Sequence, residues 1–146
     1  MQNFQYEWFY LYISITGMLF LVACIISEWG KLYDKTKWID LVLHGLSAGL
    51  IFTPAGFWLA YNLTKSPLWL ASLFAFSFSM MVISIWEVIE FTIDSIFKTN
   101  MQRWKSKTKD KDQRGNGLLD SMWDIIATLI GTTITCILLL TLAFVL

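Results

Sequence analysis

Charged residues are scarce in this sequence, and their scarcity excludes an ordinary soluble domain. Lysine, arginine, aspartate and glutamate make up 15% of the 146 residues, whereas a soluble domain carries about 25%. Hydrophobic residues make up 56%. The uncharged stretches are long enough to cross a bilayer, which takes about 20 residues each. Little sequence is left between them, so we expect a single membrane domain over residues 1–146.

Cysteine is nearly absent as well, which argues against a scaffold held by disulfides. The two cysteines, Cys24 and Cys136, lie in apolar runs near opposite faces of the membrane and cannot meet within one protomer. The chain also lacks a nucleotide-binding glycine loop, a usable Ser-His-Asp pattern and a zinc-type Cys/His cluster. Residues 1–7 lack the positive region of a cleavable signal peptide, so we expect the first span to be retained. Nucleic acid is not an expected partner.

Four apolar runs predict an all-α polytopic membrane protein, a bundle of four transmembrane helices. A kink is expected in the second run at Thr53-Pro54, because proline interrupts helical hydrogen bonding. Gly45 and Gly49 form a pair of small residues four apart, which favours close helix packing. The four predicted spans cover about residues 8–27, 38–61, 68–97 and 118–145.

Basic residues gather in two of the predicted loops. Loop 98–117 carries most of the lysines and arginines, loop 28–37 carries three lysines, and the opposite side has only Lys65. The positive-inside rule therefore places both loops in the cytoplasm and both termini on the non-cytoplasmic side. Each basic residue near the surface adds about 1 kcal/mol of attraction to anionic lipids. The residues expected to contact lipid headgroups are Arg103, Lys105 and Arg114.

Acidic residues and the only histidine fall at the predicted cytoplasmic ends of three spans. Asp40 and His44 are four apart and share a helix face, as do Asp120 and Asp124 on the last span. Because the three ends meet at one side of the membrane, we expect one polar layer in the inner leaflet. Its members are Asp40, His44, Glu87, Glu90, Asp120 and Asp124, with Asp94 and Glu28 at its edge.

An acidic layer at this depth requires compensation, since an ionised acid costs roughly 2.5–3.5 kcal/mol at the centre of a transmembrane helix. Some acids are protonated, or basic loop residues such as Arg103 pair with them, or cations are bound. Carboxylates with one imidazole suit Mg²⁺, Mn²⁺, Zn²⁺ or Fe²⁺. The predicted metal ligands are the six layer residues, from Asp40 to Asp124. A structural layer of solvated or paired acids is the alternative interpretation.

Three functions are compatible with this layer. In the first, a metal polarises a lipid phosphate or carbonyl, and catalysis depends on Glu87 and Asp124. In the second, the protein is a non-enzymatic assembly protein whose small residues Gly45, Gly49 and Gly131 pack against another protomer or a membrane partner. In the third, an oligomer passes ions or protons, although the outer half offers only scattered serine and threonine.

The same residues carry a family resemblance. Asp40-x-x-x-His44, Trp86-Glu87-x-x-Glu90 and Asp120-x-x-x-Asp124 followed by Gly131 resemble the YjdF-type bacterial inner-membrane proteins. The chain is more distantly similar to VanZ-like proteins, in which Arg114 and Asp124 match two places. It departs from that pattern where Thr128 stands for an asparagine, and its two aspartates are four apart instead of three. The resemblance implies a bacterial cytoplasmic membrane protein with these polar residues grouped, and the VanZ-like part implies a link to the cell envelope and glycopeptide tolerance.

Overall fold

A computed structural model describes residues 2–32, 36, 38–98, 101 and 114–145. Helices account for nearly all of the described residues, and no strand occurs among them. Their bounds are α1 (Gln2–Trp29), α3 (Ile39–Ser47), η1 (Ala48–Phe52), α4 (Thr53–Thr64), α5 (Leu68–Phe97) and α6 (Arg114–Val145). The predicted all-α class is confirmed. Helix α6 begins four residues before the predicted span, within the sequence assigned to the basic loop.

Four helical segments are long and apolar enough to cross a membrane: Glu7–Trp29, Ile39–Thr64, Leu68–Phe97 and Leu118–Leu142. The second of them consists of α3, η1 and α4, which follow one another without a loop. A helix satisfies its own backbone hydrogen bonds, which is what hydrocarbon demands of a spanning segment. Large apolar side chains such as Leu19, Leu73 and Ile137 point outward, as expected for a surface that faces lipid.

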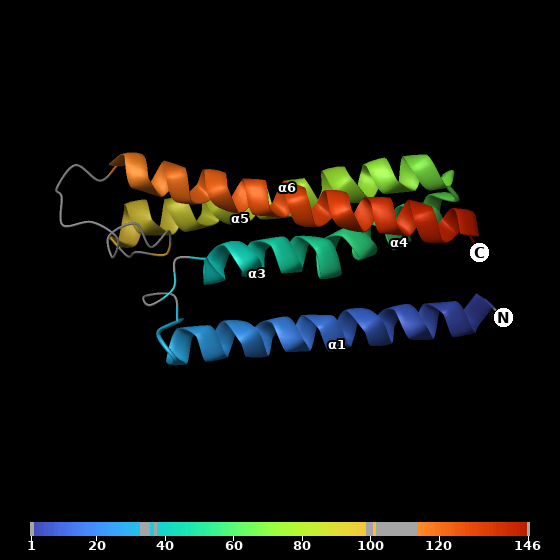
Figure 1. Cartoon of the computed structure of the whole chain (residues 1–146), viewed down its shortest axis with the longest axis horizontal. Helices are drawn as coiled ribbons and strands as arrows, with labels where there is room; N and C mark the ends of the chain where they lie inside the picture. The colour runs from blue at the N-terminus through green and yellow to red at the C-terminus, as the bar shows by residue number, and fades with distance from the viewer. Residues whose placement is uncertain (1, 33–35, 37, 99–100, 102–113, 146) are drawn as a thin grey trace.

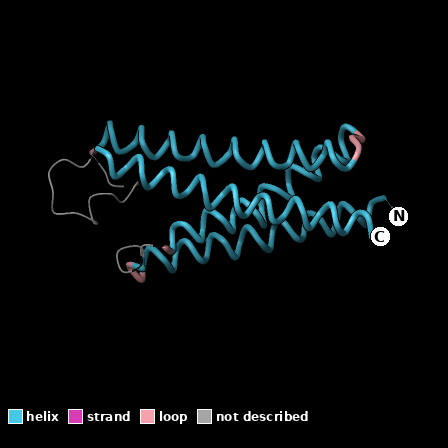
Figure 2. Tube along the Cα trace, turned by 45° about the horizontal axis from the view of Figure 1, so that its top comes forward, coloured by secondary structure: helices cyan, strands magenta, loops and turns pink. Residues whose placement is uncertain are grey.

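The four spans run alongside one another (Figure 1). Both termini lie at one end, and the ends that join α1 to α3 and α5 to α6 lie at the other. Figure 2 shows the same arrangement from a second direction. Helix α1 runs along α3 and η1 at the edge of the bundle, whereas α3, α4, α5 and α6 pack closely. The connected end is the one that the sequence predicts to be cytoplasmic.

The predicted kink takes the form of a π-helical turn, η1, placed just before Pro54. Pro54 has no backbone N–H, so it cannot donate the hydrogen bond to the Leu50 carbonyl that an α-helix would require. The Tyr12 hydroxyl donates to that carbonyl instead, at 2.8 Å. The Phe9 ring also stacks on Trp58, with ring centroids 4.6 Å apart. These two contacts hold α1 against the interrupted helix.

The second span packs against α6 through three glycines. A Cβ atom on Gly131 would lie 2.2 Å from the Gly45 carbonyl oxygen, and one on Gly49 would lie 3.0 Å from the Gly131 oxygen. Real Cβ atoms essentially never lie closer than 3.0 Å to another heavy atom, so Gly131 cannot carry a side chain in this arrangement, and the contact at Gly49 would be tight. The small residues that were predicted to pack another protomer or a partner therefore pack against each other inside the chain. Assembly with another protomer or a membrane partner stays a prediction.

Candidate functional site

Helix packing brings five of the six predicted ligands to the connected end of the bundle. Helix α3 supplies Asp40 and His44 from its first turns, and α5 supplies Glu87. Helix α6 supplies Asp120 and Asp124 on one face, four residues apart. Their ligand atoms form two groups of three, and within each group all of them lie within 4.8 Å of one another.

The inner group consists of His44, Glu87 and Asp124, and all three residues are buried. Their exposed fractions are 8%, 6% and 5%. The Nδ1 atom of His44 lies 3.7 Å from Oε1 of Glu87. Two donors at about 2.1 Å from one metal ion are at most about 4.2 Å apart, so this pair fits a shared ion as it stands.

Two buried atoms of the inner group have no hydrogen-bond partner: Nδ1 of His44 and Oε1 of Glu87. Leaving a buried polar atom unpaired costs about 1–3 kcal/mol, and more if it is charged. Ser121 hydrogen-bonds to the Glu87 side chain and fixes the position of the carboxylate. A cation between the two atoms would satisfy both.

The outer group consists of Asp40, Asp120 and Asp124, of which the first two are half-buried. Oδ1 of Asp40 lies 3.9 Å from Nε2 of His44, on the side of the ring opposite Glu87. A carboxylate near one ring nitrogen favours a proton there and leaves the other nitrogen free to bind a metal. Asp124 belongs to both groups and links the buried part of the site to its exposed part.

Three other acids that the sequence places in or beside this layer lie outside both groups. Glu90, predicted as a ligand, accepts a hydrogen bond from the Trp86 ring nitrogen at 2.7 Å. Asp94, predicted as an edge member, accepts the backbone N–H of Met101 at 2.7 Å, which closes the end of α5. Glu28 at the end of α1 belongs to neither group of described ligand atoms. The ligand role of Glu90 stays a prediction.

Two polar residues of the site were missed in the sequence. Ser121 contacts Glu87, and the hydroxyl of Thr128 is fully buried without a hydrogen-bond partner, one turn beyond Asp124. One helical face carries Asp120, Asp124 and Thr128, which are spaced four residues apart. Only the two acids were predicted to belong to the site. The predicted headgroup residues Arg103 and Lys105 lie outside the described residues. Arg114 begins α6, and only its backbone is described.

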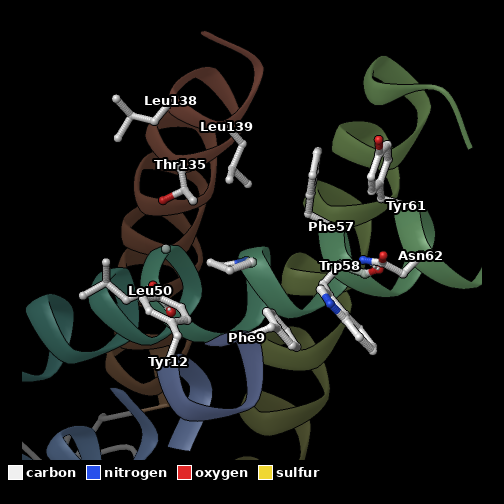
Figure 3. Close-up of a pocket in the computed structure, with 12 residues that line it drawn as sticks. Phe9, Tyr12, Leu50, Phe57, Trp58, Tyr61, Asn62, Thr135, Leu138 and Leu139 are labelled. Carbon is white, nitrogen blue, oxygen red and sulfur yellow. Dashed lines mark hydrogen bonds between the residues drawn. The ribbon is translucent and has the colours of Figure 1, made fainter. Parts of the chain in front are cut away.

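A separate pocket lies nearer the other end of the bundle, between α1, α4 and α6 (Figure 3). Its volume is about 600 Å³, within the range of ligand pockets. Phe57, Trp58 and Leu139 are among its mainly apolar lining, and it contains none of the acidic ligands. It is therefore not part of the candidate metal site.

The inner group offers one nitrogen and two carboxylate ligands from three different helices. Three protein ligands that leave a position open are typical of catalytic metal sites, and this mixture suits Zn²⁺, Mn²⁺ or Fe²⁺. Mg²⁺ prefers oxygen and keeps several waters, so it suits the outer group better. The arrangement is chemically suited to a divalent cation at the end of a membrane bundle.

Comparison with known families agrees with this architecture. A family model described as "Predicted membrane protein (DUF2238)" matches residues 5–143. The chain belongs to this family. Members of DUF2238 are membrane proteins, and the match agrees with the YjdF-type resemblance of the sequence. Comparisons with curated proteins and with solved structures gave no match.

Proposed function

We propose that this DUF2238 protein binds a divalent cation at His44, Glu87 and Asp124 and uses it on lipid or envelope precursors at the cytoplasmic leaflet. The observation that carries the proposal is the pair of unpartnered atoms, Nδ1 of His44 and Oε1 of Glu87, facing each other in the buried core. A bound cation would remove the free-energy cost of leaving these two atoms unpaired, and it would offset the repulsion between the carboxylates.

The position of the site supports a substrate that reaches it from the membrane. Asp40 and Asp120 are half-buried, so the outer group is open while the inner group is closed. A bound cation there would polarise a phosphate or carbonyl oxygen of a lipid headgroup. The basic segment between α5 and α6, with the predicted headgroup residues Arg103 and Lys105, is proposed to lie in the cytoplasm and to attract anionic lipids. The link to the cell envelope that a VanZ-like resemblance would imply stays a prediction.

Elemental analysis of the purified protein tests cation binding. After a chelator wash and reloading with Mn²⁺ or Zn²⁺, we expect stoichiometric metal in the unaltered protein and loss of metal in His44→Ala and Glu87→Gln. Glu90→Gln is the matched control, because Glu90 bonds Trp86 and should keep its metal content unchanged. Equal, low metal content in all four folded proteins would refute the site and leave a structural layer of acids.

The proposed action on lipid is tested separately, by measuring lipid products. Vesicles containing anionic lipid are incubated with the metal-loaded protein, and lipid products are followed by mass spectrometry. We expect metal-dependent turnover that disappears in Glu87→Gln and in Asp124→Asn while both variants remain folded. Turnover that survives both substitutions would contradict the enzymatic part of the proposal.

A further inference from the structure

The core between α5, α6 and the π turn holds a run of buried hydroxyl groups that begins one turn from the acidic site. Thr128 and Thr132 on α6, Ser79 on α5, and Thr53 after the π turn have no exposed surface. In the sequence, the serines and threonines of this half are scattered. Packing gathers these four in one place, where burial makes an unpaired hydroxyl costly.

Four of the buried oxygens form a closed ring. The Thr53 hydroxyl lies 2.7 Å from the Ala48 carbonyl oxygen and 3.3 Å from the Thr132 hydroxyl. The Thr132 hydroxyl lies 3.0 Å from that of Ser79, which in turn lies 3.3 Å from the Ala48 oxygen. The ring joins three segments that are far apart in the sequence.

Donors and acceptors in the ring do not match one to one. Three hydroxyl protons serve four contacts, so the Thr132 proton bonds either Ser79 or Thr53. The Ala48 oxygen has two lone pairs but three candidate donors, since it also accepts the backbone N–H of Thr53 across the π turn. The ring therefore has at least two hydrogen-bond patterns of similar quality. Exchange between such patterns is what a proton relay requires.

Unpaired hydroxyls flank the ring on both sides. The Thr128 and Ser72 hydroxyls are buried without a hydrogen-bond partner. Thr128 is one helical turn, about 6 Å, from Thr132 and from Asp124, and Ser72 is two turns, about 10 Å, from Ser79. One water joins two oxygens about 5–6 Å apart, so a continuous path would need one water in the first gap and two or three in the second.

The core hydroxyls differ from those that face lipid. The Ser77 hydroxyl donates to the Leu73 carbonyl, and that of Thr141 donates to the Ile137 carbonyl, each within its own helix. A serine or threonine in a transmembrane helix ordinarily forms its hydrogen bond in this way, with a carbonyl of its own helix. Thr132 and Ser79 bond across helices instead, to another hydroxyl and to the π-turn carbonyl.

We propose that these hydroxyls, with bound water, form a path that carries protons between the connected end of the bundle and its other half. A proton enters the hydrogen-bonded chain at Thr128, each ring hydroxyl passes on one proton as it accepts another, and a proton leaves beyond Ser72. The path needs hydroxyls and water alone, so it does not depend on the protonation of the acids or on a bound metal. It is independent of the proposed function.

Proton flux into liposomes tests this path. The protein is reconstituted with a pH-sensitive dye inside, and a potassium gradient with valinomycin drives protons inward. We expect flux above that of protein-free liposomes, and its loss in Thr132→Val, which keeps the shape of threonine without the hydroxyl. Thr141→Val is the matched control on the same helix, and it should conduct like the unaltered protein.

The outcomes separate this inference from the metal site. No flux above protein-free liposomes, or equal flux with Thr132→Val, would overturn the path. If Thr132→Val does not fold, Ser79→Ala makes the same test from α5. Metal content should be unchanged in both variants, so loss of flux with retained metal supports the path specifically. Flux in a protein that binds no metal would reject the proposed function and leave the path standing.

Discussion

Replacing Gly131 by alanine is expected to destabilise the bundle by about 1–3 kcal/mol, the usual cost of overpacking a close contact. The added Cβ would stand 2.2 Å from the Gly45 carbonyl oxygen, which is a backbone atom and cannot rotate away. The two helices must therefore separate. The measurement is the free energy of unfolding in mixed detergent micelles, for the unaltered protein and the variant.

Gly17→Ala provides the matched control for this prediction. Gly17 lies inside α1, and a Cβ there meets nothing within 4 Å. Alanine is favoured over glycine in a helix by about 1 kcal/mol, so this variant should be unchanged or slightly more stable. A Gly131→Ala protein as stable as Gly17→Ala would mean that the second span and α6 do not approach as described.

The same substitution should weaken the site, because the contact and the site share two helices. Gly45 follows His44 directly, and Gly131 lies two turns from Asp124 on α6. Separating the helices at the glycines moves the imidazole away from the carboxylate that completes the inner group. Metal content measured beside stability should therefore fall in Gly131→Ala and remain in Gly17→Ala.

The sequence was sufficient to predict the fold class and the layer of acids, because both follow from periodicity. An apolar run long enough to cross a bilayer predicts a helix. Polar residues spaced three or four apart lie on one face of that helix. Helix α5 begins and ends at the predicted residues, Leu68 and Phe97.

The details of the site depend on packing that periodicity does not contain. The predicted ligand set made no distinction between Glu87 and Glu90, three residues apart. In the fold, Glu87 turns into the core toward His44, whereas Glu90 bonds the Trp86 ring nitrogen. Thr128 was noted only as a departure from the VanZ-like pattern and Thr132 was not singled out, because a hydroxyl in an apolar run carries no signal until its neighbours are known. The glycines were recognised as a packing surface, but their partner inside the chain was not.

Asp124→Asn is expected to have the largest effect on the site, because Asp124 is the one residue common to both ligand groups. The substitution keeps the shape and removes the charge and one oxygen ligand. Loss of an outer partner of a metal ligand weakens affinity about 10–100-fold, so loss of the ligand itself should cost more. Isothermal titration with Mn²⁺ or Zn²⁺ measures this, and Asp94→Asn is the control, since an asparagine oxygen still accepts the Met101 N–H.

The metal-free form of the same variant distinguishes a binding site from a structural ion-pair layer. Asp124 interacts electrostatically with four other carboxylates, all of the same sign: Asp40, Glu87, Asp120 and Glu90. If the cluster exists to bind a cation, removing one carboxylate relieves this repulsion, and metal-free Asp124→Asn should unfold at a higher temperature than the metal-free unaltered protein. Metal at 100 times its Kd should stabilise the unaltered protein by about 2.7 kcal/mol and leave the variant unchanged. A structural layer predicts the opposite sign: loss of a paired carboxylate would lower the unfolding temperature, and added metal would shift neither protein.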